Sequence, residues 1–285
     1  MTRAWLILAD ILVTLLLFLS FILYYFYLPQ KEISTSVPEQ NLTKDNFHLP
    51  RIDFNDTITL DDLLRMGQKS SAEEYFIENV FKTRTLEEGL VALSVKIGDP
   101  IFIRIFKDES LLEVWIHSGT EYQHLKDYTI CAYSGHLGPK LREGDRQAPE
   151  GFYTVTKYQL NPNSKFHLSF NLGYPNAYDR SHKRTGSFLM VHGNCVSDGC
   201  YAMTDDKIEE IYILVERALQ NGQKYVQVHV YPFIMSDENM AFYEGNEWYD
   251  FWTNLKEGYD YFEAEKLPPK IKVKHKRYEV YESSK

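Results

Sequence analysis

Three cysteines and one histidine are the residues of this 285-residue chain best suited to covalent chemistry. Cys195 and Cys200 lie in the stretch MVHGNCVSDGCYAMT, where His192 precedes Cys200 by eight positions, and Cys131 lies far upstream. A thiol becomes a useful nucleophile when a nearby base favours its thiolate. The spacing therefore suggests a Cys-His site in which His192 is the base.

The loop that carries the two downstream cysteines is rich in turn-forming residues. Gly193 and Gly199 permit tight turns and close backbone approach, and peptide N–H groups near Cys200 can face a developing oxyanion. Ser197 either orients the loop by hydrogen bonding or caps the N–H groups of a turn. These residues are the candidate oxyanion and loop residues.

Two non-catalytic interpretations of the same residues stay open. A Cys195–Cys200 disulfide can form across the loop in an oxidising compartment, with Cys131 left as a small buried side chain. A reversible bridge of this kind would also regulate the nucleophile. A metal site built from His192, Cys195 and Cys200 lacks the CxxC and HxxxH spacings and a fourth ligand, so we expect neither a metal nor another cofactor.

Three segments of the chain resemble one enzyme family. HGNCVSDGCYAMT resembles the active-site signature of the YkuD-type L,D-transpeptidases, in particular their YafK-like subgroup, as do SGHLGPKLREGDRQAPEGFY and NPNSKFHLSFNLGYPNAYD upstream. The resemblance covers about residues 90–232. It implies a β-rich catalytic fold, an exported location, and attack by Cys200, with His192 as the base, on peptidoglycan stem peptides after a diaminoacid.

The motif also departs from the common pattern of that family, which has Ser/Thr-His-Gly-Cys and an arginine two residues after the cysteine. Asp198 stands in place of the histidine, and Ala202 stands in place of the arginine. These departures leave two acceptors of the acyl group open: an amine, which gives transpeptidation, or water, which gives hydrolysis. Resemblance to the YafK-like subgroup, which is linked to the detachment of a lipoprotein from peptidoglycan, favours water.

Local cations are needed to bind a carboxylate-rich stem peptide on an acidic protein, because the chain carries 31 Lys and Arg against 40 Asp and Glu. Charge-assisted hydrogen bonds suit this task, and solvated loop charge is the competing interpretation. Further residues of the matching segments either line the cleft or build its turns. The candidate substrate-binding residues are Lys140, Arg142, Arg146, Tyr153, Asn171, Tyr174 and Arg180.

The elements that must position these residues are mainly β. Short β-branched and aromatic runs predict strands at 91–98, 101–107, 111–119, 128–135, 152–158, 167–170, 187–192 and 225–231, in a mostly antiparallel sheet. Helical spacing predicts a helix over 205–221, which follows the cysteine motif directly. The aromatic segment 236–266 predicts a helical cap on the sheet, followed by a basic tail with an edge strand.

The N-terminus suggests a membrane anchor. Residues 4–28 form an apolar run with one charge, Asp10, and exceed the roughly 20 residues that cross a bilayer. Tyrosines stand where a signal-peptide cleavage site would lie, so we expect the segment to be retained. The polar stretch that follows is typical of a tether, and the net charge of −9 disfavours nucleic acid as a partner.

These patterns together predict an α+β protein with a β-sandwich catalytic domain. The expected organisation is an anchor (1–28), a tether (29–58), a helical lead-in (59–89), the catalytic domain (90–235) and a helical aromatic cap with a basic tail (236–285). The expected partners are the membrane, peptidoglycan stem peptides and a peptidoglycan-attached lipoprotein, with the catalytic domain in the periplasm and the anchor in the inner membrane. The alternative is a non-catalytic peptidoglycan-binding or envelope scaffold protein with a Cys195–Cys200 disulfide.

Overall fold

The structure is a computed structural model that describes residues 85–282. The predicted anchor, the tether and the lead-in up to residue 84 lie outside these residues. In the part of the chain that the structure describes, no helix combines the length and the apolar character needed to span a bilayer.

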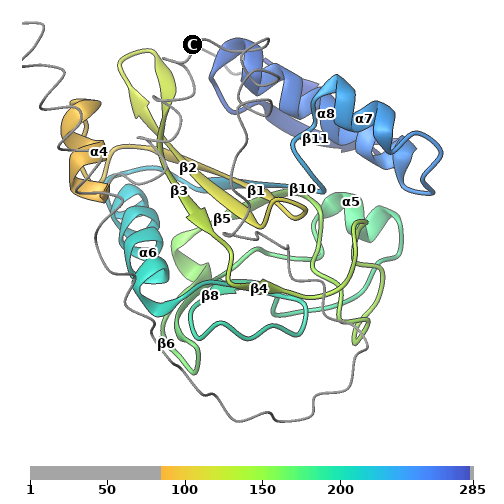
Figure 1. Ribbon diagram of the computed structural model, residues 1–285, viewed down its shortest axis with the longest axis horizontal. Helices are drawn as coiled ribbons and strands as arrows, with labels where there is room; N and C mark the ends of the chain where they lie inside the picture. Colours follow the sequence, from red (N-terminus) through yellow and green to blue (C-terminus); the bar gives the residue numbers. More distant parts are fainter. Residues whose placement is uncertain (1–84, 283–285) are drawn as a thin grey trace, which may run out of the picture. The chain divides into compact units, whose positions relative to one another are not determined.

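Helices and strands alternate along the described residues (Figure 1). The helices are α4 (Leu86–Ala92), η1 (Lys157–Gln159, a 3-10 turn), α5 (Ala177–Ser181), α6 (Asp205–Gln220), α7 (Asp237–Phe242) and α8 (Tyr249–Glu265). The strands are β1 (Ile101–Phe106), β2 (Leu111–Ser118), β3 (Glu121–Thr129), β4 (Ala132–Tyr133), β5 (Gly151–Val155), β6 (Leu160–Ser164), β7 (His167–Asn171), β8 (Met190–His192), β9 (Tyr201–Ala202), β10 (Val226–Tyr231), β11 (Lys270–Lys274) and β12 (Arg277–Tyr281).

Most of these strands belong to two five-stranded sheets. The first has the order β3-β2-β1-β10-β5, and the second has the order β4-β9-β8-β7-β6. The pairs β1–β10 and β8–β9 are parallel, whereas the other pairs in these sheets are antiparallel. The parallel β8–β9 pair forces the chain to return along the sheet between residues 193 and 200, so the cysteine motif lies on a crossover loop.

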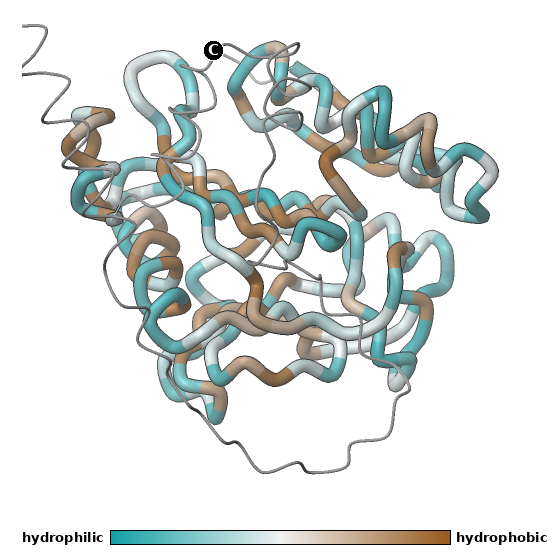
Figure 2. The backbone as a smooth tube through the Cα atoms, in the orientation of Figure 1, coloured by the Kyte–Doolittle hydropathy of each residue, from teal (hydrophilic) through white to brown (hydrophobic). Residues whose placement is uncertain are grey.

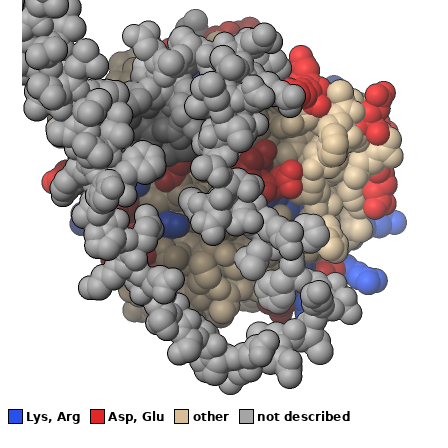
Figure 3. All heavy atoms as spheres, viewed as in Figure 1, with Lys and Arg blue, Asp and Glu red and all other residues tan. Residues whose placement is uncertain are grey.

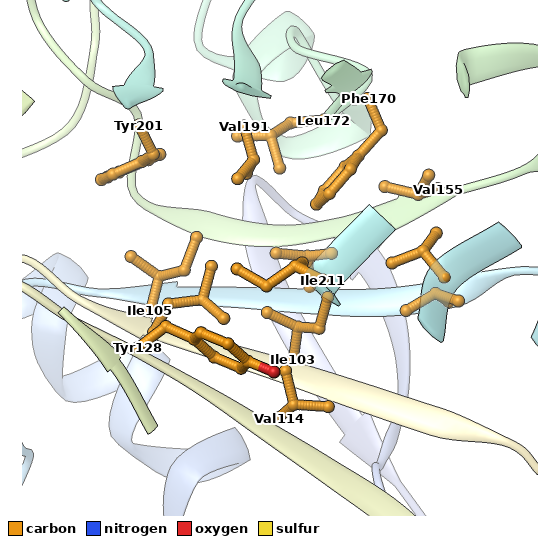
Figure 4. Close-up of a cluster of buried hydrophobic side chains, with 14 of the residues drawn as sticks. Ile103, Ile105, Val114, Tyr128, Val155, Phe170, Leu172, Val191, Tyr201 and Ile211 are labelled. Carbon is orange, nitrogen blue, oxygen red and sulfur yellow. The ribbon is translucent and has the colours of Figure 1, made fainter. Parts of the chain in front are cut away.

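The main hydrophobic core lies between the two sheets and beside α6. Ile103 and Ile105 of the first sheet face Val191 and Tyr201 of the second (Figure 4). Helix α6 adds Ile208, Ile211, Tyr212, Leu214 and Val215 from one face. Figure 2 shows hydrophobic segments along the central strands and alternating hydrophobic and hydrophilic segments along α6, as expected for an amphipathic helix.

The opposite face of the first sheet is covered by the C-terminal helices. All six residues of β1 are buried, which requires a cover on both faces of that strand. A second core cluster that includes Phe106, Tyr231, Phe251 and Trp252 provides this cover, and α7 and α8 lie over the sheet in Figure 1. The predicted helical aromatic cap is therefore present. It is broken between Phe242 and Tyr249, and the predicted tail strand is the β11–β12 hairpin.

Several predicted strands differ from the structure. The prediction of a strand over 91–98 is wrong, because α4 extends to Ala92 and the first sheet begins only at Ile101. A capping box between Thr85 and Glu88 stabilises that helix, and Val91 is 76% exposed, so no strand partner favours an extended backbone there. The predicted strand at 187–192 shortens to β8, and the one at 128–135 divides between β3 and β4.

A buried ion pair fixes the long loop between β4 and β5. Lys107 is fully buried, and its Nζ donates to the carbonyl oxygens of His136 (2.7 Å) and Gly138 (3.0 Å) and to Glu150 Oε1 (3.0 Å). Glu150 Oε2 accepts from Trp252 Nε1 of α8 at 2.9 Å. Because every polar group of such a pair must be satisfied in a dry interior, this network holds the loop that leads to the site.

Candidate active site

Strand register places Cys200 and His192 on one face of the second sheet. Val191 pairs with Tyr201, and His192 pairs with Ala202, so by continuation of this register Met190 lies opposite Cys200, which directly precedes β9. Val191 and Tyr201 are core residues between the sheets. Since successive side chains of a strand alternate between faces, Cys200 and His192 lie on the face that points away from that core.

The Cys200 thiol is half-buried and hydrogen-bonded to the backbone. Met190 N–H donates to Sγ at 3.4 Å, and Sγ–H donates to Phe188 O at 3.6 Å. Burial raises the pKa of this thiol; the Asp198 charge also raises it, whereas the Met190 N–H and the Lys140 charge lower it, and the net effect is upward. The raised pKa favours the neutral thiol form of Cys200 at neutral pH.

The His192 imidazole is buried and oriented by the backbone. Its Nδ1 lies 2.6 Å from Gly193 O, and its ring packs on Phe166 with centroids 4.7 Å apart. Because a carbonyl oxygen only accepts, Nδ1 carries the proton in the neutral ring and Nε2 is the free base. Burial lowers the pKa of His192, and the bond to Gly193 O opposes this shift only partly.

The structure brings the predicted nucleophile and base to adjacent strands without a direct hydrogen bond between them. The described partners of the thiol are Met190 and Phe188, and the described partner of the imidazole is Gly193. Catalytic hydrogen bonds are often long in ligand-free enzymes and tighten when substrate binds. The arrangement thus has a neutral thiol beside a neutral base, from which general-base activation of sulfur is chemically feasible.

The disulfide in the structure differs from the predicted one. Cys195 pairs with Cys131 across 64 residues of sequence, with 5.3 Å between the two Cα atoms, and Cys200 is a free thiol. The predicted alternative of a Cys195–Cys200 bridge is therefore wrong, as is the idea of Cys131 as an unpaired buried side chain. The physical reason is that β4 runs beside β9, so Cys131 N–H donates to Ala202 O (2.8 Å) and Cys195 N–H donates to Met203 O (3.1 Å).

The predicted oxyanion and loop residues are occupied in holding the crossover loop. Gly193 N–H donates to Phe166 O and Leu168 O, and Gly199 N–H donates to the Ser134 and Ser197 hydroxyls. Gly199 has a φ of +110°, which disfavours any other residue there. Ser197 Oγ donates to Cys200 O at 2.7 Å and accepts from Gly199 N–H at 3.3 Å, so contacts of both predicted kinds, loop-orienting and turn-capping, are present. An oxyanion role for these N–H groups stays a prediction.

The three predicted cations of the 140–146 segment differ in how they relate to Cys200. Lys140 is buried, ion-paired with Asp145, and its charge acts on Cys200. Arg146 Nε lies 3.5 Å from Asp198 Oδ1 in a pair that is about four-fifths exposed. Arg142 is exposed, and its backbone N–H donates to Asp145 Oδ2 at 2.9 Å. Figure 3 shows both acidic and basic side chains on the visible face, and in an acidic protein a local cation favours the binding of an anion.

The other predicted substrate-binding residues build the fold in this structure. Tyr153 and Tyr174 are core residues whose hydroxyls donate to Glu150 O and Lys140 O. Asn171 Oδ1 accepts from Gly173 N–H in a turn, and Arg180 Nη1 donates to Pro175 O. Their placement explains why these segments are rich in turn-forming and aromatic residues, and the structure gives them no contact with Cys200 or His192.

Two residues near the candidate site escaped the sequence analysis. Ser134 bonds to the loop before Cys200, and Phe188, 70% exposed with a φ of +55°, supplies the carbonyl that accepts from the thiol. A serine and an exposed phenylalanine carry no local signal of such roles. Among residues 85–282, no group of three or more His, Cys, Asp or Glu side chains is arranged to hold a metal ion.

The neutral state of the thiol predicts a specific pH dependence of its alkylation. Since the pKa of Cys200 is raised, the thiolate fraction at pH 7 is small, and the iodoacetamide rate should rise about tenfold per pH unit until it levels off above the ordinary thiol range. Asp198→Asn removes a charge that raises this pKa. The midpoint of the alkylation rate against pH should therefore move to lower pH in this variant. Glu244→Gln, at an exposed position in the C-terminal cap, is the matched control. A plateau already present at pH 6 would contradict a neutral thiol.

The Cys131–Cys195 disulfide predicts a stability loss that leaves the chemistry in place. We expect the double substitution Cys131→Ser, Cys195→Ser to lower the free energy of unfolding by about 2–4 kcal/mol, because the unfolded chain is then less constrained. Urea unfolding with and without reductant measures this loss of unfolding free energy. Cys200→Ser is the control, because it keeps the Cys131–Cys195 disulfide. Turnover should persist where the variant is folded, since neither sulfur is the predicted nucleophile; equal stability of the double variant and the unmodified protein would contradict the pairing.

Comparison with known proteins identifies the family to which this chain is similar. Residues 100–230 match the model of the YkuD L,D-transpeptidase catalytic domain. The protein named "Putative L,D-transpeptidase YafK" of Escherichia coli strain K12 is 50% identical over 184 residues, which is 65% of this chain and 75% of that protein, and its counterpart in Escherichia coli O157:H7 gives the same values.

Solved structures resemble this chain over only part of its length. The helical cell shape determining protein Pgp2 of Campylobacter jejuni is 18% identical, with a TM-score of 0.38 over 67% of this chain and 80% of that chain. Bd1075 of Bdellovibrio bacteriovorus is 18% identical, with a TM-score of 0.34 over 57% of this chain and 58% of that chain. On the family match and the identity to YafK, the chain belongs to the YkuD L,D-transpeptidase catalytic-domain family.

Proposed function

We propose that this protein is a cysteine enzyme that acts on peptidoglycan stem peptides through a thioester at Cys200. The observation that carries the proposal is the placement of a free, half-exposed thiol and an oriented neutral imidazole on adjacent strands of one sheet. Membership of the L,D-transpeptidase family supports the substrate class. The non-catalytic scaffold alternative rested on a Cys195–Cys200 bridge, and Cys200 is free.

In the proposed acylation, Cys200 Sγ attacks the carbonyl carbon that follows the diaminoacid centre. His192 Nε2 accepts the thiol proton, the C–S bond forms, and the C–N bond breaks as the same proton passes to the leaving amine. In the second half, an acceptor gives its proton to His192 and attacks the thioester. The C–S bond then breaks, and the proton returns to the sulfur.

We further propose that water is the main acceptor, so that the net reaction releases a peptide or lipoprotein joined to diaminopimelate. Ala202 is fully buried and apolar, and Asp198 is an exposed carboxylate paired with Arg146. Neither residue supplies the imidazole or guanidinium expected in cross-linking members. An amine acceptor that is held less well loses its proximity advantage over abundant water.

The proposed location follows from the proposed substrate and from the apolar N-terminal run. We propose that residues 1–28 anchor the protein in the inner membrane and that the catalytic domain faces the periplasm. A reporter fused after Lys285 should then be active only when it is exported. Reporter activity in the cytoplasm would contradict this topology.

The reaction is tested by mass spectrometry of labelled peptidoglycan after incubation with the purified full-length chain. One arm contains no added amine, and the other contains a large excess of a free D-amino acid. We expect hydrolysis products to dominate at low amine and Cys200→Ala to give none. Exchanged or cross-linked products in the low-amine arm would favour transfer instead, and no change in any stem peptide would contradict the proposed function.

A further inference from the structure

The crossover loop is held at two points by one short segment of the chain, Cys131–Ser134, which contains β4. At one end, Cys131 forms the disulfide to Cys195. At the other end, the Ser134 hydroxyl lies 2.8 Å from that of Ser197. The backbone of Ser134 is itself fixed, because Ser134 O accepts from Ala148 N–H at 2.9 Å. A rigid element therefore supports the loop just before the nucleophile.

The hydrogen-bond directions at Ser134 follow from the partners. Ser197 Oγ lies 2.7 Å from Cys200 O, and a carbonyl oxygen only accepts, so the single Ser197 proton is used there. Ser134 must then donate to Ser197 Oγ. Gly199 N–H donates to Ser134 Oγ at 3.0 Å and to Ser197 Oγ at 3.3 Å. Ser134 Oγ, Ser197 Oγ and Gly199 N–H thus form a three-membered hydrogen-bonded cluster, and Ser197 links it to Cys200 O. We call these four groups the serine relay.

We propose that Ser134 is a positioning residue for the Cys200 nucleophile, acting through the serine relay. The relay binds a polar backbone group of Gly199 and one of Cys200, on either side of the bond that joins these residues. Their backbone angles determine where Cys200 Sγ points, which in this structure is toward Met190 N–H and Phe188 O. The catalytic part of this inference rests on the proposed function of Cys200.

The position of Ser134 separates this role from ordinary packing. Ser134 is half-buried, and the hydrogen bonds described for its hydroxyl all go to the crossover loop. Ser197 alone cannot replace it, because the Gly199 N–H is farther from Ser197 Oγ and that oxygen is already shared. Removing the Ser134 hydroxyl should therefore loosen Gly199 and Cys200 while leaving the hydrophobic core intact.

The test compares Ser134→Ala, Ser134→Thr and Ser118→Ala in the full-length chain. Ser118 is a half-buried serine at the end of β2 whose hydroxyl bonds only weakly to Leu93 O at 3.4 Å. We expect Ser134→Ala to lower kcat about 10- to 100-fold with little change in KM, as expected for a misplaced reacting atom. Ser134→Thr, which keeps the hydroxyl, should restore most of the rate, and Ser118→Ala should behave as the unmodified protein.

A second readout does not depend on any substrate. The loosened loop should expose the thiol to water, so the midpoint of Cys200 alkylation against pH should move down in Ser134→Ala and return in Ser134→Thr. Unchanged kcat and unchanged midpoint in Ser134→Ala would overturn the inference, as would a Ser134→Thr variant as impaired as Ser134→Ala. If the unmodified chain turns over no stem peptide, the proposed function fails, and the alkylation midpoints still decide the role of Ser134.

Discussion

Cys200→Ala is expected to reduce turnover of peptidoglycan stem peptides below detection while the protein stays folded. Cys200 is the free cysteine among the described residues, and it directly precedes β9, the strand that pairs with β8 and its predicted base His192. No other side chain near it can form a thioester, so the covalent step is lost altogether. Release or exchange of labelled stem peptides, followed by mass spectrometry, measures the effect.

The matched control for Cys200→Ala is Val196→Ala, a 51% exposed position on the same crossover loop. This variant should turn over substrate at close to the rate of the unmodified protein. The Cys131–Cys195 disulfide and the melting temperature should be unchanged in both variants. A loss of turnover in Cys200→Ala would then come from the missing thiol and not from unfolding. Residual turnover in Cys200→Ala with an intact fold would contradict the thioester mechanism.

His192→Gln is expected to lower kcat by about 10²- to 10⁴-fold, the usual contribution of a general base. A glutamine amide can still donate to Gly193 O, as Nδ1 does, but it cannot accept a proton at neutral pH. The fold around the site should therefore persist while proton transfer fails. Single-turnover kinetics of acyl-enzyme formation at Cys200 separate this loss from a binding defect.

The dependence of kcat/KM on pH in the unmodified protein gives a further test of His192, because the direction of its pKa shift is known. Since burial lowers the pKa of His192, the base stays neutral below the pH at which an ordinary histidine is protonated. The acid limb of kcat/KM should thus lie below that of a free histidine, and His192→Gln should abolish this limb. His182→Gln, at a ring that bonds to Lys276 O away from the site, is the control. Full activity of His192→Gln would exclude His192 as the base.

The local patterns of the sequence determined much of the scaffold. The run IFIRIFK and the alternating LLEVWIHS predicted β1 and β2, because buried and half-buried strands have these periods. The spacing of Ile208, Ile211, Tyr212 and Val215 predicted α6 almost to its ends, since one helical face must be apolar to pack on a sheet. The cysteine motif, by its resemblance to a family, indicated Cys200 and His192 as the residues to examine.

The pairing of distant segments was decided only by the tertiary structure. Cys131 joins Cys195, and Ser134 meets Ser197, because β4 packs beside β9 at a register that no local pattern encodes. The same holds for the aromatic residues Tyr153 and Tyr174, which match cleft segments in sequence and prove to be core residues once both sheets are assembled.

The sequence by itself thus determined which residue types are available for chemistry. Their spacing along the chain predicted many of the helices and strands that carry them. Tertiary structure decided which thiol stays free, which hydroxyls bond the backbone next to Cys200 and which cations are buried. The physical reason is that disulfides, hydrogen bonds and desolvation act over a few ångströms in space. They therefore depend on strand order and register across the sheets, and a local sequence window contains neither.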